Sequence, residues 1–275
     1  MSIEQLLFWQ EESAEPPKRR EPAAMPRNEL KQRVLAYLVA LEPDAIALNV
    51  PVRRSKFTVG AACAFIATKG KLHHNCVTKT VAVEVFNDRT DCLPDYSNNA
   101  ASYDRLRKME QEKTELEAAI RRDEPELRST CDLFPDEDFA EYDYRASQKH
   151  PYLRLLRRLE RTRHAIFRGS RLENIRRANA ADYLYLAVPQ GAIEPHELAP
   201  GWGLLEVTPQ LEVIETSPAP DLSENVSTAG RNHLALNIAR AAAGNVLFAN
   251  GILQNADEIT IYPAPRRRRK VKYKL

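Results

Sequence analysis

The stretch TVAVEVFNDRTDCLPD, residues 80–95, decides how the rest of the sequence is interpreted. Its first half is apolar and rich in valine and ends at Phe86, which is typical of a strand. Side chains alternate along a strand, so Glu84 and Phe86 are expected on the same face. The second half is polar and predicts a turn. It carries three acidic residues: Asp88, Asp91 and Asp95.

The residues before this stretch predict a helix and a β-hairpin. FTVGAACAFIA at 57–67 reads as a short strand, and TKGK at 68–71 reads as the turn that joins it to the next strand. NELKQRVLAYLVAL at 28–41 places apolar residues along one stripe of a helix that Asn28 can cap. Between them lies a short apolar run, IALNV at 46–50.

The residues after it predict a helical block. Long helices are expected at 98–128 and at 151–167, and the two can pair as an antiparallel hairpin. A third helix is expected at 171–181. The second helix carries four arginines that form a broad positive face. This face could contact nucleic acid or pair with the acids of the opposing helix, and we favour the pairing. These arginines are Arg154, Arg157, Arg158 and Arg161.

The strand pattern then returns. Three apolar or alternating runs are separated by Pro/Gly turns: DYLYLAVP at 182–189, GWGLLEV at 201–207 and LEVIE at 211–215. A helix at 231–249 and the short run EITIY at 258–262 follow. This order predicts an α/β fold with a mixed sheet and a helical hairpin inserted across about 97–180. Trp202, at the entry of one strand, is expected in the core.

Composition predicts an ordinary globular protein. The 275 residues are 43% hydrophobic and 28% charged, and no run of 18 apolar residues is present, so no membrane partner is expected. The N-terminus has no export signal, and the four cysteines lack paired spacing, which favours reduced thiols and a cytoplasmic location. We expect a flexible segment at 1–27, one domain at 28–265 and a basic tail at 266–275.

Charge is distributed unevenly. The tail holds seven basic side chains and no acid, and the preceding residues hold 33 Lys and Arg against 38 Asp and Glu, a net charge of −5. A second basic stretch, free of acids, covers 51–80. Both could contact nucleic acid, or they could be solvated ends of the fold. The candidate nucleic-acid contacts are Arg53, Arg54, Lys56, Lys69, Lys71, Arg266, Arg267, Arg268 and Arg269.

Two stretches together resemble the MmcB-like DNA-repair branch of the PD-(D/E)XK nuclease superfamily. EVFNDRTDCLPD at 84–95 is similar to the family's strand ending in EIK or EVK, followed by a polar turn with two acids. ADYLYLAVP at 181–189, followed by GLLEV at 203–207, is similar to the family's late strands. An opening helix carrying Glu29 also fits. The resemblance covers about 28–96 and 180–215 and implies a restriction-endonuclease-like core.

The resemblance implies a metal site that this sequence lacks in part. That chemistry needs two or three carboxylates around Mg²⁺ and a lysine near the attacking water. Phe86 stands at the lysine position. No acid occurs between Asp44 and Glu84, and the expected aspartate falls near Ala61 or Ala62. We therefore expect a degenerate site and no cofactor.

One rescue of the site stays open. Glu84 and Asp91, with Asp88 nearby, could form a rebuilt Mg²⁺ site if the turn folds back. Alternatively, Asp88 and Asp91 cap the turn or the next helix, which we favour. Lys79 cannot replace the missing lysine, because its odd position places it on the face opposite Glu84.

These observations predict a nuclease-like protein that binds nucleic acid or a repair partner without cutting. Two alternatives remain. One is an active Mg²⁺-dependent nuclease built on Glu84 and Asp91. The other is a protein-interaction scaffold that uses the helical hairpin. The sequence does not decide the oligomeric state.

Overall fold

The chain forms an α/β structure with a six-stranded mixed sheet. The computed structural model describes residues 25–52, 57–69, 74–93, 96–128, 142–249, 252–254 and 259–261. The sheet strands are β1 (Ala45–Pro51), β2 (Thr58–Lys69), β3 (His74–Val85), β4 (Tyr183–Pro189), β5 (Gly203–Val207) and β6 (Val213–Ser217). They lie side by side in sequence order. The expected α/β class is therefore confirmed.

The predicted β-hairpin forms the centre of one half of the sheet. β2 and β3 pair antiparallel, with Ala61 opposite Val83 and Ala62 opposite Ala82. The apolar run 46–50 forms the edge strand β1, which pairs antiparallel with β2. Our expectation left this run without a strand assignment, because its four apolar residues show no regular alternation with polar ones.

In the other half of the sheet, the pairing of neighbouring strands changes from antiparallel to parallel. β3 and β4 are parallel, as are β4 and β5, whereas β6 runs antiparallel to β5. Parallel neighbours need a long crossover, and the segment between β3 and β4 supplies it. Its helices are α2 (Arg89–Cys92), α3 (Tyr96–Asp123), α4 (His150–Ile166) and α5 (Arg171–Arg177).

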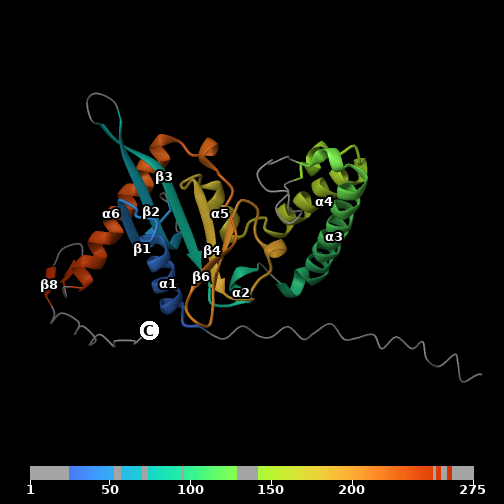
Figure 1. Ribbon diagram of the computed structural model, residues 1–275. Coiled ribbons are helices and arrows are strands. Elements are labelled where there is room, and N and C mark those ends of the chain that lie inside the picture. The colour runs from blue at the N-terminus through green and yellow to red at the C-terminus, as the bar shows by residue number, and fades with distance from the viewer. Residues whose placement is uncertain are drawn as a thin grey trace, which may run out of the picture.

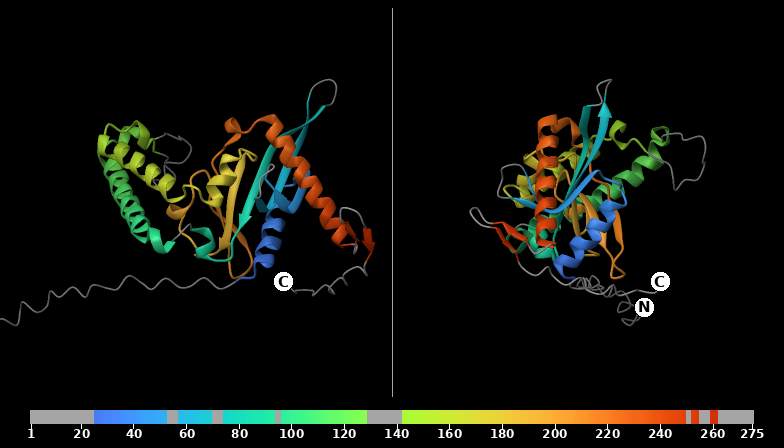
Figure 2. Two further views of the ribbon diagram at one scale, coloured as in Figure 1. Left: turned by 180° about the vertical axis from the view of Figure 1, so that it is seen from behind. Right: turned by 90° about the vertical axis from the view of Figure 1, so that its left-hand side faces the viewer.

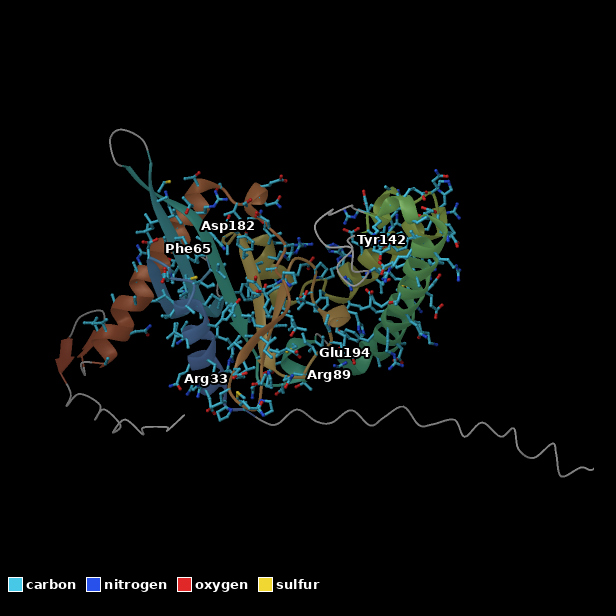
Figure 3. All side chains as sticks on the ribbon, viewed as in Figure 1. Arg33, Phe65, Arg89, Tyr142, Asp182 and Glu194 are labelled. Atoms are coloured by element: carbon cyan, nitrogen blue, oxygen red, sulfur yellow. The ribbon has the colours of Figure 1, made fainter. Side chains whose placement is uncertain are left out.

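A buried ion pair aligns β3 with β4 at the end of the sheet where β4 begins. Asp182 is 1% exposed and accepts hydrogen bonds from the backbone N–H and the hydroxyl of Thr80, both at 2.8 Å. Arg231 completes the set, with its Nη2 2.6 Å from the carboxylate. Figure 3 shows Asp182 at one end of the sheet, with Arg89 towards the other.

Helices cover both faces of the sheet. α1 (Arg27–Val39) packs its buried Leu30, Val34 and Leu38 on one face, while α6 (Thr228–Ala249) packs on β1, β2 and β3 from the other. The right-hand view of Figure 2 shows the sheet between α1 and α6. Trp202, 3% exposed, belongs to the core on the α6 side, as expected.

The helices α3 and α4 pair with each other and stand beside the sheet (Figure 1). Tyr152 and Leu155 of α4 are buried, as are Leu106 and Met109 of α3. The pair matches the two long helices expected from the sequence, although α3 ends at Asp123, before the expected boundary.

The remaining elements lie near the C-terminus. A second sheet of two short strands, β7 (Ile252–Gln254) and β8 (Ile259–Ile261), follows α6. The sequence indicated only the second of these strands. None of the helices in the described ranges is long and apolar enough to cross a membrane.

Candidate functional site

The candidate site is centred on Glu84, near the C-terminal end of β3. The side chain is 0% exposed, although its chemistry favours water. Phe86 follows two residues later, is 6% exposed and lies in the same core cluster as Ala82. The alternation of side chains therefore places Glu84 and Phe86 on one face, as expected.

Two arginines from different helices hold the buried carboxylate. Arg171, the first residue of α5, places Nη2 3.4 Å from Oε1 and 3.3 Å from Oε2 of Glu84. Arg27, the first residue of α1, places Nη2 3.4 Å from Oε1. Arg171 also donates to the carbonyl of Thr58 at 2.5 Å. One carboxylate is thus shared by two guanidinium groups.

Both arginines lie against aromatic rings. The Arg27 guanidinium is 5.9 Å from the ring centroid of Phe86, and that of Arg171 is 5.7 Å from the ring of Phe57. A guanidinium stacks well on an aromatic face, so the rings hold the two cations in place. The side chains of Arg27 and Arg171 remain 45% and 36% exposed, and solvent ions can reach them.

The burial of Glu84 opposes its ionisation. Loss of hydration raises the pKa of Glu84, and the nearby charges of Arg171, Arg27 and Lys31 lower it only in part. The same crowding acts on Lys31, because burial and the neighbouring Arg27 lower the pKa of its ammonium group. Positive charge is in excess at this position.

A cavity of about 370 Å³ opens beside these cations. Three cationic side chains line it, and Asp91 is its one acidic lining residue. Lys31 donates to Asn49 at 2.6 Å on the same wall. The lining residues are Arg27, Lys31, Asn49, Thr58, Val59, Gly60, Phe86, Asp91 and Arg171. A cavity of this composition can bind an anion.

Two positions were expected to lack catalytic groups, Phe86 and the pair Ala61 and Ala62, and the structure places each of them relative to the cavity. Phe86 lines the cavity where the resemblance implied a lysine. Ala62 lies opposite Ala82 and shares the core cluster on the face of Glu84, whereas Ala61 belongs to the cluster on the α1 side. Of the two alanines, Ala62 therefore marks the face where a second carboxylate would be needed.

Of the three acids that follow β3, Asp88 caps the next helix. Asp88 is the N-cap of α2 and accepts hydrogen bonds from the N–H of Asp91 at 2.9 Å and the hydroxyl of Thr90 at 2.7 Å. This confirms the capping interpretation for Asp88. Asp91 is exposed and lines the cavity, and Asp95 lies outside the described residues. Within the described ranges, no three or more His, Cys, Asp or Glu residues are grouped so that they could hold a metal ion.

Most of the predicted basic contacts cannot be placed. The following lie outside the described residues: Arg53, Arg54, Lys56, Lys71, Arg266, Arg267, Arg268 and Arg269. Lys69 ends β2, and its side chain is also outside them. Lys79 lies over the rings of Phe65 and Tyr183, at 5.4 Å and 4.6 Å, and so takes no part in the site at Glu84.

Sequence reasoning missed the cations that define this site. Arg27 and Lys31 are four residues apart at the start of α1, so both lie on one helix face. That spacing was a usable signal, but our sequence prediction assigned only Glu29 of this helix to the site. Arg171 belongs to an arginine-rich segment whose members could not be told apart without the fold.

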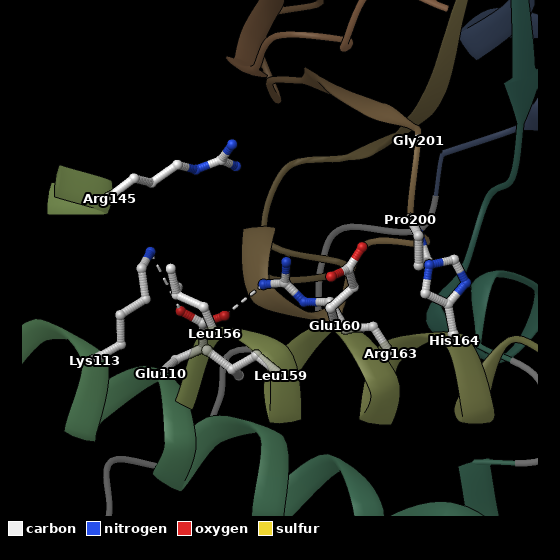
Figure 4. A pocket seen from close by; sticks show the side chains of 10 residues that line it. All are labelled: Glu110, Lys113, Arg145, Leu156, Leu159, Glu160, Arg163, His164, Pro200 and Gly201. Carbon is white, nitrogen blue, oxygen red and sulfur yellow. Dashed lines mark hydrogen bonds and ion pairs between the residues drawn. The ribbon is translucent and has the colours of Figure 1, made fainter. Parts of the chain in front are cut away.

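A second cavity of about 340 Å³ lies between α4 and the loop at Pro200 and Gly201 (Figure 4). Its charges are mixed and partly cancel. Arg163 lies 2.5 Å from Glu110, and Lys113 lies 3.9 Å from the same carboxylate. Three basic and two acidic side chains line this cavity, so its excess of positive charge is smaller than that of the lining beside Glu84, where three basic side chains face one acid.

No family model, curated protein or solved structure matches this chain.

Proposed function

We propose that this protein is a nuclease-like protein that binds nucleic acid without cutting it, through the cavity beside Glu84. In this proposal the sheet is a restriction-endonuclease-like core, and α3 and α4 are a helical hairpin inserted in it. The observation that carries the proposal is the pair of guanidinium groups on the buried Glu84 carboxylate.

The residues at the cavity do not fit a Mg²⁺ site. Mg²⁺ binds through carboxylate oxygens and water, and both oxygens of Glu84 already accept from arginine. A second carboxylate is missing at Ala62, and Phe86 cannot orient a water molecule. Arginine at this position instead suits a phosphate, which guanidinium groups bind in a bidentate manner.

Glu84 acts in this proposal as a competitor of the phosphate. An ionised Glu84 offsets one of the two positive charges of Arg27 and Arg171, and protonation frees both guanidinium groups to bind an external anion. Since burial raises the pKa of Glu84, this release begins at a higher pH than for an ordinary glutamate. Nucleic-acid binding should therefore strengthen as the pH falls.

The test is fluorescence-anisotropy titration of a short DNA duplex and of the matching single strand. Glu84→Gln should bind several-fold more tightly than wild type at neutral pH, and the wild-type affinity should approach it as the pH is lowered. Arg27→Gln should bind several-fold more weakly. Arg240→Gln, which removes an exposed arginine of α6, is the matched control and should leave affinity unchanged.

The same samples separate this proposal from the nuclease alternative. Incubation with Mg²⁺ should leave labelled DNA intact, and EDTA should leave binding unchanged. Mg²⁺-dependent cleavage that Glu84→Gln abolishes would replace the proposal with an active nuclease rebuilt on Glu84 and Asp91. A wild-type protein that binds neither form of DNA nor RNA would favour a scaffold that binds protein partners.

A further inference from the structure

The outer face of α4 carries four arginines that have no ionic partner among the described residues. Arg154, Arg157, Arg158 and Arg161 are all exposed, and none forms an ion pair with another described residue. Their spacing of three, one and three residues places them on one side of a helix. We call this side the arginine face of α4.

This result corrects the expectation that these arginines pair with acids of α3. The ion pairs that join the two helices use other residues of the α4 segment. Arg163 contacts Glu110 at 2.5 Å, and Lys149 contacts Asp123 at 2.6 Å. The acids of α3 that face α4 are thereby neutralised, while the arginine face points away from them. The sequence did not reveal which arginines faced inward.

Within the α3–α4 pair, the charge excess lies on α4. Its 17 residues include five arginines and one glutamate, whereas α3 contains six basic and six acidic residues. Four adjacent cations that no described acid pairs with repel one another, and a polyanion would relieve that repulsion. All five cations are arginine rather than lysine, which favours the bidentate recognition of phosphate groups.

The opposite face of α4 argues against a membrane surface as the partner. Interfacial helices bind lipid by burying an apolar face in the bilayer. Most apolar residues of α4 are buried or partly buried in the protein, and Tyr152, Leu155 and Leu159 are each at 4% exposure or less. Only the charged face is available, so the partner must be recognised by charge.

We infer that the arginine face of α4 is a second contact surface for the phosphate backbone of nucleic acid. The inference shares its ligand with the proposed function, but it uses a different element and none of the residues at Glu84. A backbone contact of this kind would be independent of base sequence and strongly dependent on salt.

The experiment removes the four charges together and measures the salt dependence of binding to a short mixed-sequence DNA duplex. The variant is Arg154→Gln, Arg157→Gln, Arg158→Gln and Arg161→Gln, because glutamine preserves helix propensity. Loss of four phosphate contacts should reduce the slope of log K against log salt by about 3.6, at about 0.9 per contact. Affinity at low salt should fall by about tenfold or more.

The matched control removes four exposed basic residues from α3, where acids are interspersed: Arg105→Gln, Arg107→Gln, Lys108→Gln and Arg122→Gln. Its slope should stay within about one unit of the wild-type value. Circular dichroism melts of both quadruple variants should match the wild-type melt. A variant of α4 that melts normally and keeps the wild-type slope would overturn the inference.

The outcomes distinguish this inference from the proposed function. A slope that falls in the α4 variant, with affinity unchanged in Arg27→Gln, would support the arginine face and overturn the proposed role of the cavity. An unchanged slope in the α4 variant, with weaker binding by Arg27→Gln, would support the cavity alone. Binding to phosphatidylserine vesicles but not to DNA would overturn the inference in favour of a lipid surface.

Discussion

Glu84 has exchanged hydration by water for two guanidinium groups, and its protonation should therefore be linked to folding. Burial raises its folded pKa above the ordinary value of 4.5, so the folded state holds the proton more tightly than the unfolded chain. The resulting stabilisation is fully present below pH 4.5 and is lost as the pH rises through the raised pKa.

Urea unfolding of wild type and Glu84→Gln at several pH values tests this linkage. The difference in the free energy of unfolding between the two, wild type minus variant, should decrease as the pH rises from 4.5 towards neutrality, because only the wild type carries the titrating group. The comparison cancels the titration of other residues. A difference that stays constant over this range would mean that Glu84 titrates with an unperturbed pKa.

Asp182 is a second buried carboxylate, and its contribution to stability can be measured. Its oxygens accept from Thr80 and Arg231, and Asp182→Asn removes the charge while leaving Arg231 largely buried. Breaking one partner of a buried pair costs about 3–5 kcal/mol, so we expect a loss of this size in the free energy of unfolding.

The control for Asp182 is an exposed ion pair. Asp104 lies 3.9 Å from Arg107, and both side chains are more than 60% exposed. Asp104→Asn should change stability by less than about 0.5 kcal/mol, since solvent screens such pairs. Equal effects of the two substitutions would contradict the structural role assigned to Asp182.

At the scale of elements, the α3–α4 pair depends on both apolar packing and a partly buried ion pair. Arg163 and Glu110 have side-chain exposures of 31% and 21%. A double-mutant cycle with Arg163→Gln and Glu110→Gln should give a coupling of about 1 kcal/mol by urea unfolding. The more exposed pair of Lys149 and Asp123 should give less than half of that. Equal coupling energies for the two pairs would imply that burial does not strengthen the ion pair between Arg163 and Glu110.

The elements that the sequence predicted are those with a strong period or clear turn chemistry. The hairpin of β2 and β3 has a polar turn between two apolar runs, and α4 repeats its apolar residues at helical spacing. β1 was missed as a strand because an apolar run of five residues has no period. The pairing of β3 with β4 depends on contacts between residues about 100 positions apart, as at Thr80 and Asp182, which local patterns do not contain.

At the scale of the whole molecule, the sequence shows the gap in acidic residues more directly than it shows which cations meet at Glu84. The absence of acids between Asp44 and Glu84 is visible along one stretch of chain. The cavity, by contrast, is assembled from α1, β2 and α5, and only the fold brings Arg27 and Arg171 to the same carboxylate. The arginine face of α4 was visible as composition, but the absence of ion pairs between it and the other described residues was not.

The position of α6 in the chain has a consequence for biosynthesis. β1, β2 and β3 are made early, yet the helix that covers one of their faces is made only after β6, and Asn237 of α6 reaches back to the carbonyl of Pro51 at 2.9 Å. A nascent chain that has completed the β-hairpin therefore carries an apolar sheet face to which its cover has not yet been added. Transiently exposed faces of this kind recruit chaperones or aggregate. Ribosome-bound chains stalled before α6 should accordingly be captured by chaperones, and chains stalled well beyond it should be released from them.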